Sequence, residues 1–314
     1  MHEPNRPISQ QLIVAVVGPT GSGKTALAST IAQALGGEVL GCDALQIRAG
    51  LPLLTAKPSP DELAQVPHHL IGVLPLDQAA TAARYAALAD AVLAELAARG
   101  CPAVLCGGTG LYLRALCDGL FAGPPADPGL RSSLKEKAQQ LGLAELHRQL
   151  AQVDPVAAAR INVADYVRIE RALEVFLQTG RPISDWFAEH QAERRRGPRY
   201  RTLRIALDPG PDALRLRIAC RTQSMLDQGL LDEVAAQRRQ GCVSDPPLGY
   251  DLACQHLDGA LTLAELKVAL AQQTAQYARR QRTWFRREEG VTWYPDAAAV
   301  PLGELVAAVR RVAA

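Results

Sequence analysis

Short, continuous apolar runs rich in β-branched residues recur along the chain, and they predict strands that are buried on both faces of a parallel sheet. The first run, Leu12–Val17, is followed by a glycine-rich turn and by good helix formers at Lys24–Leu35. The later runs lie at Glu38–Leu40, Ala103–Cys106, Leu203–Leu207 and Val291–Tyr294. Helical stretches such as Ala82–Arg99 separate the runs, which is the pattern of a doubly wound α/β sheet.

The pattern of buried strands stops in the middle of the chain. There the sequence reads as amphipathic helices punctuated by Gly, Pro and Asp, including Pro128–Leu141 and Asp165–Gln178. We therefore expect residues 121–201 to form an inserted, all-helical domain. Residues 1–120 and 202–314 would then form the α/β core around the parallel sheet.

Two long helical stretches follow the return to the sheet, at Asp212–Arg239 and Thr262–Arg287. The second stretch begins with Thr262 and Glu265 in the spacing of a capping box, in which each side chain binds a main-chain N–H of the other residue. This spacing predicts a helix that starts at a well-defined position.

Composition places the chain among ordinary folded proteins. Of its 314 residues, 48% are hydrophobic and 21% are charged, and the net charge is only +2. The basic residues are nearly all arginine and concentrate at 194–204 and 279–287, where they would meet phosphates if the partner were a nucleic acid. The seven cysteines form no CxxC pair and the six histidines no HExxH spacing, so neither disulfides nor zinc are expected. No signal pattern or apolar run of about 18 residues occurs, and we expect a cytoplasmic monomer without a membrane segment.

The segment GPTGSGKT matches the phosphate-loop (P-loop) pattern G-x-x-x-x-G-K-[ST] and lies between a predicted strand and a predicted helix, as that pattern requires. Its glycines let main-chain N–H groups curl around phosphate oxygens, Lys24 supplies a positive charge, and the Thr25 hydroxyl can reach Mg²⁺. These features predict a P-loop NTPase-like core and a polyphosphate ligand. The residues expected to bind its phosphates are Gly18, Pro19, Thr20, Gly21, Ser22, Gly23, Lys24 and Thr25.

The phosphate loop alone does not name the reaction, because kinases, GTPases, motor ATPases and one group of transferases share it. The Asn-Lys-x-Asp motif that reads guanine in GTPases is missing. The predicted strand Ala103–Cys106 runs into glycines instead of the acidic residue expected of a motor ATPase. A small-molecule kinase, with Arg194–Arg196 as a mobile lid, stays open.

Further candidate residues follow the ends of predicted strands, where open α/β sheets place their ligands. Asp43 comes just after the second strand and can act as a general base, although an Asp in a turn also caps helices. Thr109, within Gly107–Gly110, offers a hydroxyl at the same edge, where a plain strand-to-helix turn is the alternative. Arg217 and Arg221 share a helix face through their i,i+4 spacing, so both could bind one diphosphate, although a solvated face would have the same spacing.

With these residues in view, the chain resembles the tRNA dimethylallyltransferases, also called isopentenyl-diphosphate:tRNA transferases. The resemblance covers nearly the whole chain, and several of its motifs are not expected in kinases. The motifs are GPTGSGKT, TAKP at 55–58, PHHLI at 67–71, GGTGLYLRAL at 107–116, RALEV at 171–175, TGRP at 179–182, LGY at 248–250, and YARRQ with TWFR within 277–286.

The resemblance implies that the phosphate loop binds dimethylallyl diphosphate instead of a nucleoside triphosphate, with Mg²⁺ as the cofactor. The prenyl group would pass to the exocyclic amine of the adenine just 3′ of the tRNA anticodon, and diphosphate would leave. By the same likeness, Asp43 takes the amine proton and Thr109 helps to hold the reacting groups. Extrusion of the target base makes physical sense, because a stacked adenine amine cannot reach a buried allylic carbon.

The resemblance also implies contacts with the tRNA anticodon stem-loop. The helical insertion would close over the stem-loop, and the two arginine concentrations would bind its phosphates. Tyr277, Trp284 or Phe285 could line the path of the base, although aromatic residues at such positions are as often part of a core. The expected tRNA-binding residues are Ala44, Leu45, Gln46, Arg131, Val167, Arg168, Ile169, Glu170 and Arg171.

Several positions depart from the motifs of the family. Ala44 and Arg48 stand where the family has Ser and Tyr, Asn162 replaces a His, Asp251 replaces a basic residue, and Ala275 replaces an Arg. These departures bear on the tRNA contacts and the rate more than on the reaction type. They also keep open a third hypothesis, a non-catalytic RNA-binding relative, which would bind tRNA without releasing diphosphate.

Overall fold

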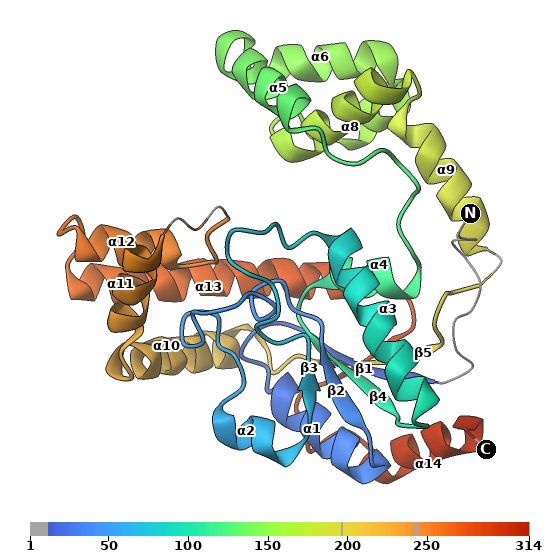
Figure 1. Cartoon of the computed structure of the whole chain (residues 1–314), viewed down its shortest axis with the longest axis vertical. Coiled ribbons are helices and arrows are strands. Elements are labelled where there is room, and N and C mark those ends of the chain that lie inside the picture. The colour runs from blue at the N-terminus through green and yellow to red at the C-terminus, as the bar shows by residue number, and fades with distance from the viewer. Residues whose placement is uncertain (1–11, 196, 242, 244, 314) are drawn as a thin grey trace. The chain divides into compact units, whose positions relative to one another are not determined.

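The computed structural model describes residues 12–195, 197–241, 243 and 245–313. The chain divides into two compact units (Figure 1). Unit 1 comprises Met1–Gly119 together with Arg199–Ala314, and unit 2 comprises Leu120–Pro198. Unit 2 is thus inserted between two halves of unit 1.

Unit 1 is built on a parallel sheet with the strand order β3-β2-β4-β1-β5-β6, which confirms the predicted α/β class. All of the strands predicted from the apolar runs are present, within a residue or so of their expected ends. The edge strand β3 was not predicted, because its two residues are histidines and give no apolar signal. The strands are β1 Ile13–Val17, β2 Glu38–Gly41, β3 His68–His69, β4 Ala103–Gly107, β5 Thr202–Leu207 and β6 Val291–Tyr294.

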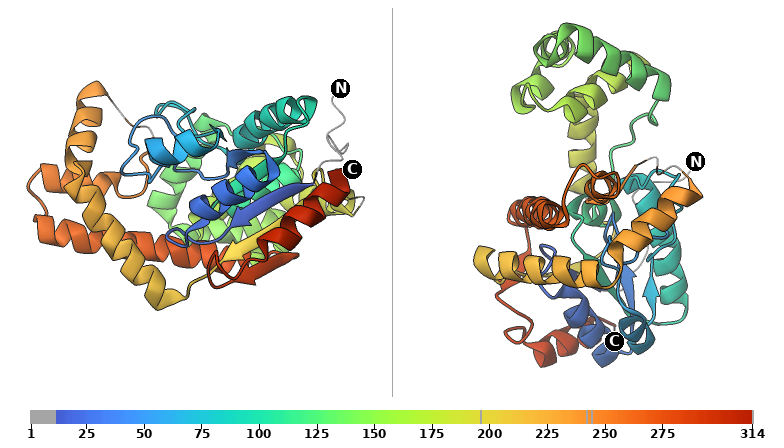
Figure 2. Two further views of the ribbon diagram at one scale, coloured as in Figure 1. Left: turned by 90° about the horizontal axis from the view of Figure 1, so that it is seen from below. Right: turned by 90° about the vertical axis from the view of Figure 1, so that its left-hand side faces the viewer.

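Alternate residues of the central strand β1 point into different halves of the core. Ile13, Ala15 and Val17 pack on the face covered by α3 (Ala82–Ala98) and α4 (Gly110–Cys117). Val14 and Val16 pack on the opposite face against α1 (Lys24–Leu35) and α14 (Leu302–Ala313). Figure 2 shows that helices cover both faces of the sheet. A fully apolar strand such as β1 is therefore buried on both sides, as its composition predicts.

Additional helices of unit 1 follow the insertion. Two of them, α10 (Pro211–Asp227) and α11 (Leu230–Gln240), form the predicted helical stretch Asp212–Arg239, which is broken into two helices. The break comes at Gly229, whose φ of +95° is a left-handed conformation that glycine adopts readily. The predicted capping box at the start of α13 is confirmed. The remaining helices of unit 1 are α2 Pro60–Gln65, α10 Pro211–Asp227, α11 Leu230–Gln240, α12 Tyr250–Leu257 and α13 Leu263–Phe285.

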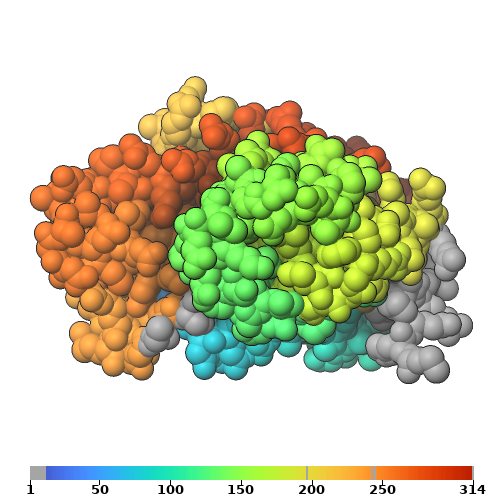
Figure 3. Space-filling view, turned by 90° about the horizontal axis from the view of Figure 1, so that it is seen from above, coloured from blue at the N-terminus to red at the C-terminus, as the bar shows by residue number. Residues whose placement is uncertain are grey.

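Unit 2 is entirely helical in the part of the chain that the structure describes. Its helices enclose a core of their own that includes Leu146, Leu150 and Ile169, and their side chains form a closely packed body in the space-filling view (Figure 3). No described helix of either unit is long and apolar enough to cross a membrane. The helices of unit 2 are α5 Pro128–Leu141, α6 Leu143–Val153, α7 Pro155–Arg160, α8 Tyr166–Thr179 and α9 Ile183–Arg194.

Candidate active site

The phosphate loop joins the end of β1 to the start of α1. Gly18 has a φ of +129°, and a Cβ atom there would lie 2.6 Å from the Leu207 carbonyl oxygen, so only glycine fits. The Lys24 ammonium donates a hydrogen bond to the Pro19 carbonyl at 2.8 Å. Burial lowers the pKa of Lys24, while the neighbouring Cys106 and Asp43 act in the opposite direction.

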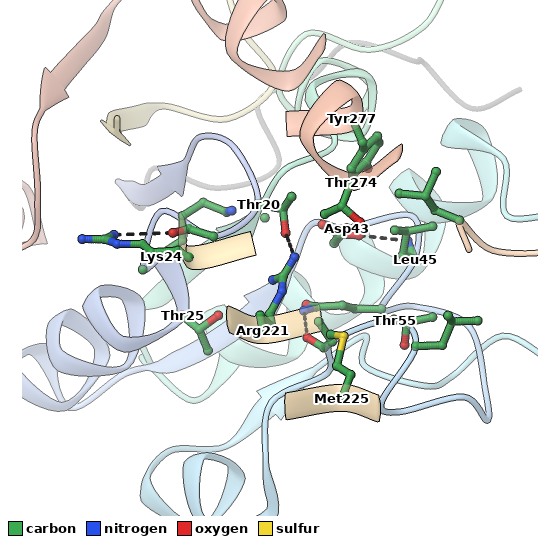
Figure 4. A pocket seen from close by; sticks show the side chains of 18 of the residues that line it. Thr20, Lys24, Thr25, Asp43, Leu45, Thr55, Arg221, Met225, Thr274 and Tyr277 are labelled. Atoms are coloured by element: carbon green, nitrogen blue, oxygen red, sulfur yellow. Dashed lines mark hydrogen bonds between the residues drawn. The ribbon is translucent and has the colours of Figure 1, made fainter. Parts of the chain in front are cut away.

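The loop opens into a cavity of about 380 Å³ (Figure 4). Three of the predicted phosphate-binding residues do not line the cavity: Gly18, Pro19 and the buried Ser22. The loop residues that line the cavity are Thr20, Gly21, Gly23, Lys24 and Thr25.

Helix α10 brings both predicted arginines to the same cavity. The Arg221 guanidinium donates a hydrogen bond to the Thr20 hydroxyl at 2.8 Å, and Arg217 reaches the Gly21 and Ser22 carbonyls at 3.4 Å. Burial lowers the pKa of Arg221, and Asp43 opposes this shift. The two guanidinium groups and Lys24 therefore surround the phosphate loop with positive charge.

Asp43 lines the cavity at the carboxyl end of β2. Its Oδ1 accepts a hydrogen bond from the Leu45 N–H at 2.9 Å, which holds the turn after the strand. Leu45 and Gln46 line the cavity as well, whereas Ala44 and Thr109 do not. Instead, the Ala44 N–H donates to the Thr109 hydroxyl at 2.9 Å, so Thr109 fixes the main chain next to Asp43.

The glycines of the sequence GGTG allow three segments to meet at this point. A Cβ atom on Gly107 would lie 2.0 Å from the Cys42 carbonyl oxygen, and one on Gly108 would lie 2.0 Å from Gln281 Nε2. A Cβ on Gly110 would lie 2.1 Å from the Trp284 ring. The close approach of α13 therefore depends on Gly108 and Gly110, and that of the segment after β2 depends on Gly107.

Helix α13 supplies two site residues that the sequence did not single out, Thr274 and Gln281, beside the predicted Tyr277. Gln281 is 4% exposed, and its Oε1 accepts a hydrogen bond from the Thr20 N–H at 2.8 Å. Thr274 and Tyr277 line the cavity, as do Thr55 and Met225 from other segments. Burial raises the pKa of Tyr277, Asp43 adds to this shift, and the Thr109 and Gln281 side chains oppose it. The motif YARRQ contained this signal, because its Tyr and Gln are four residues apart and share a helix face.

The other two aromatic residues of α13 lie elsewhere. Phe285 is fully buried in the core of unit 1. Trp284 packs on Gly110 and lies 4.8 Å from the Arg114 guanidinium, measured to the ring centroid. Of the three aromatic residues considered for the path of the base, Tyr277 alone lines the cavity.

Two of the predicted tRNA-binding arginines of unit 2, Arg131 and Arg171, form an ion cluster with the buried Glu174. Glu174 has no exposed side-chain surface, and it pairs with Arg131 at 2.9 Å and with Arg171 at 2.6 Å. Its Oε1 also accepts a hydrogen bond from the Asp127 N–H. Burial would raise the pKa of Glu174, but the two guanidinium groups and this N–H lower it to about 2. The cluster holds α5 against α8.

The stretch from Val167 to Arg171 is one segment of α8 with two kinds of side chain. The Ile169 side chain is fully buried in the core of unit 2, and Glu170 accepts a hydrogen bond from the Tyr166 hydroxyl. Val167 and Arg168 are exposed, and Arg168 pairs with Asp165 at 2.6 Å. Among these five residues, Val167 and Arg168 have the side chains most open to a partner.

Several arginines of the two concentrations form ion pairs within unit 1. Arg199 pairs with Asp90 at 2.7 Å. Arg282 and Arg286 both bind Asp208, which follows β5. Arg194 and Arg195 are exposed at the end of α9, and Arg196 lies outside the described residues.

Two further departures from the family motifs, Arg48 and Asn162, make specific contacts in the structure. Arg48 is buried and forms an ion pair with Asp245, which lies shortly before the LGY turn at 248–250. Asn162 Oδ1 accepts a hydrogen bond from the Ala164 N–H at 2.9 Å and so stabilises the turn before α8. Arg48 thus ties the loop after β2 to the segment that precedes α12.

The described residues contain no group of three or more His, Cys, Asp or Glu side chains that could hold a metal ion. The Thr25 hydroxyl, the oxygen donor that the phosphate-loop pattern predicts for Mg²⁺, lines the cavity beside Lys24. Mg²⁺ commonly takes most of its ligands from phosphate oxygens and water, so this sparse donor set suits a diphosphate-bound ion.

The fold and the cavity define a P-loop NTPase-like protein with a carboxylate, Asp43, and three cationic side chains around its phosphate loop. The sequence profile described as IPP transferase matches residues 46–288. A tRNA dimethylallyltransferase of Anaeromyxobacter dehalogenans is 45% identical over 90% of this chain and 92% of its own, and one of Koribacter versatilis is 42% identical over 96% and 99%. The chain therefore belongs to the IPP transferase family.

Solved structures agree with this assignment. The tRNA isopentenylpyrophosphate transferase of Bacillus halodurans is 33% identical, with a TM-score of 0.68 over 96% of this chain and 97% of its own. A eukaryotic dimethylallyltransferase acting on tRNA has the same fold, with a TM-score of 0.71 at 23% identity over 96% of this chain and 78% of its own.

Proposed function

We propose that this protein transfers the dimethylallyl group of dimethylallyl diphosphate to the exocyclic amine of the adenine just 3′ of the tRNA anticodon, and that it releases diphosphate. The observation that carries the proposal is a carboxylate, Asp43, in the same cavity as a phosphate loop that Lys24 and Arg221 flank. Membership of the IPP transferase family, and relatives named tRNA dimethylallyltransferase, support it.

In this reaction the amine lone pair forms a bond to C1 of the dimethylallyl group. The bond between C1 and the diphosphate oxygen breaks, and its electron pair leaves with the diphosphate. The proton lost by the amine passes to an Asp43 carboxylate oxygen, because the delocalised amine is too weak a base to keep it. The positive charges of Lys24, Arg217 and Arg221 stabilise the negative charge that grows on the leaving group.

Thr109 acts on this chemistry through the main chain. Its hydroxyl holds the Ala44 N–H, and this bond keeps Asp43 oriented into the cavity. Mg²⁺ bound by the Thr25 hydroxyl and the diphosphate would add positive charge to the leaving group.

We further propose that unit 2 binds the anticodon stem-loop through exposed side chains, including Val167, Arg168, Arg194 and Arg195. In unit 1, Leu45 and Gln46 line the cavity where the target base would enter. The Glu174 cluster gives Arg131 and Arg171 a structural task in addition to any contact with tRNA. Since the substrate is tRNA, the enzyme would work in the cytoplasm, and a monomer suffices because one chain supplies all of these residues.

The test is transfer of label from radioactive dimethylallyl diphosphate to unmodified bulk tRNA. We expect label in the RNA, and none in a tRNA transcript whose adenine 3′ of the anticodon is replaced by guanine. Phosphoryl transfer from ATP without RNA would instead indicate a kinase. Binding of tRNA without label transfer or diphosphate release would indicate a non-catalytic relative.

A further inference from the structure

Helix α10 presents side chains of changing polarity to the cavity at regular spacing. Arg217, Arg221 and Met225 all line the cavity and are four residues apart. The two arginines bind the phosphate loop, with Arg221 at 2.8 Å from the Thr20 hydroxyl. Since a helix rises about 1.5 Å per residue, Met225 lies roughly 6 Å further along the axis than Arg221. The charged end of the cavity thus gives way to an apolar end within one turn of α10.

At its apolar end the cavity borders a hydrophobic cluster, against which Met225 packs. Leu54 and Leu248 line the cavity together with Met225. Leu54 is 9% exposed and belongs to a hydrophobic cluster against which Met225 also packs. In Figure 4 the Lys24 and Thr25 side chains lie to the left of Arg221, and the Met225 side chain lies to its right, with Thr55 beyond it.

The residues behind Leu54 are tightly packed, so the Leu54 side chain has little room to move. A Cβ atom on Gly249 would lie 3.2 Å from Leu54 Cδ1 and 2.7 Å from Leu270 Cδ2, so the turn between Leu248 and α12 is pressed against both leucines. In such a packed region, extra ligand atoms can be accommodated only by displacing side chains.

We propose that Met225 limits the length of the prenyl group that this enzyme accepts, an inference that rests on the proposed function and deepens it. With the diphosphate held at Lys24 and Arg221, a five-carbon tail ends near Met225. A geranyl tail carries a second isoprene unit, which would have to enter the space that Met225 fills. The limit acts on the apolar tail alone, because the phosphate contacts are one helical turn away.

The experiment compares transfer to tRNA from dimethylallyl diphosphate and from geranyl diphosphate, using the full chain. In Met225→Ala we expect the ratio of kcat/KM for geranyl over dimethylallyl diphosphate to rise by at least about tenfold. Inhibition by inorganic diphosphate should stay unchanged, because this probe has no tail. The matched control is Leu226→Ala, since Leu226 is the next residue of α10 and packs on the same cluster but does not line the cavity.

A second variant tests the opposite direction. Met225→Phe should raise KM for dimethylallyl diphosphate severalfold and leave inhibition by inorganic diphosphate unchanged. The inference is overturned if Met225→Ala keeps the wild-type ratio, or if Leu226→Ala raises the ratio as much. Wild type that transfers no dimethylallyl group to tRNA would refute the proposed function itself, which separates the two failures.

Discussion

The side-chain carbonyl of Gln281 accepts a hydrogen bond from the main-chain N–H of Thr20 at 2.8 Å, across 261 residues of sequence. Gln281 lies in α13 and Thr20 lies in the phosphate loop, and Gly108 of the GGTG turn makes room for the amide between them. One buried side chain therefore joins the phosphate-binding loop to the turn that orients Asp43. We therefore expect Gln281 to position the phosphate loop through this hydrogen bond and the GGTG turn through packing against Gly108.

We expect Gln281→Leu to weaken binding of diphosphate, because the Thr20 N–H loses its acceptor and the loop loses a fixed peptide. Loss of such a bond is worth about 1 to 2 kcal/mol, or about a fivefold to thirtyfold increase in Kd. Inhibition by inorganic diphosphate measures this effect. Gln276→Leu, at an exposed position of the same helix, is the control. Equal losses in the two variants would mean that Gln281 acts only through the packing of α13.

Lys24→Ala should weaken binding of dimethylallyl diphosphate by about tenfold to a hundredfold, since a charge-assisted hydrogen bond to phosphate is lost. Affinity for tRNA should be nearly unchanged, because Lys24 meets only the leaving group. The two affinities are measured by separate titrations, with the exposed Lys267→Ala as the control. An equal fall in tRNA affinity would show that the ligand of the phosphate loop is not the diphosphate alone.

Asp43→Asn removes the base but keeps an oxygen that can accept the Leu45 N–H. The rate of prenyl transfer should fall by roughly two or more orders of magnitude, with the affinities for tRNA and diphosphate changed only slightly. Single-turnover transfer is the measurement, and Asp61→Asn on the exposed side of α2 is the control. If wild type were no faster than Asp43→Asn, the chain would be a decayed relative and the enzyme claim would fail.

Replacing Arg194 and Arg195 by Gln should weaken tRNA binding and flatten its salt dependence, by about one unit of slope or less per lost phosphate contact. Both side chains are exposed. The control is the same charge change at Arg310 and Arg311 of α14. Arg310 binds the Ala34 carbonyl, at the end of α1 away from the phosphate loop. If the salt dependence of tRNA binding were unchanged in the α9 variant, Arg194 and Arg195 would not contact tRNA phosphates.

Glu174→Gln should lower the free energy of unfolding by about 3 kcal/mol, because it leaves Arg131 and Arg171 without their carboxylate. Urea unfolding of the full chain at pH 7 measures the loss. Glu136→Gln, on the exposed face of α5, is the control and should change little.

The loss should also depend on pH. The pKa of Glu174 is about 2 in the folded state, below its ordinary value of 4.5, so the carboxylate stabilises the fold above pH 4.5. As the pH falls from 4.5 toward 2, the unfolded chain takes up the proton first and the stabilisation disappears. The difference between wild type and Glu174→Gln should therefore shrink over this range. A difference that stays constant would mean that the Glu174 carboxylate is not what stabilises the cluster.

The sequence alone predicted all strands of the sheet except β3, the phosphate loop, and the edge at which the site lies. These features are local: a strand such as β1 is apolar over consecutive residues, and the loop with Lys24 follows it directly. Because parallel strands end at one edge, Asp43 and the GGTG turn could be placed near the loop before any coordinates were known. The family motifs added the reaction by resemblance.

Only the tertiary structure decided which side chains meet across long separations. Nothing in the local pattern of α8 shows that Arg131, 43 residues earlier in α5, pairs with a buried Glu174, nor that Arg48 binds Asp245 nearly two hundred residues later. The bond from Thr20 to Gln281 and the position of Met225 at the apolar end of the cavity are of the same kind. Such contacts depend on how helices pack on the sheet, and packing is set by the shapes of all neighbouring side chains together instead of by any one stretch of sequence.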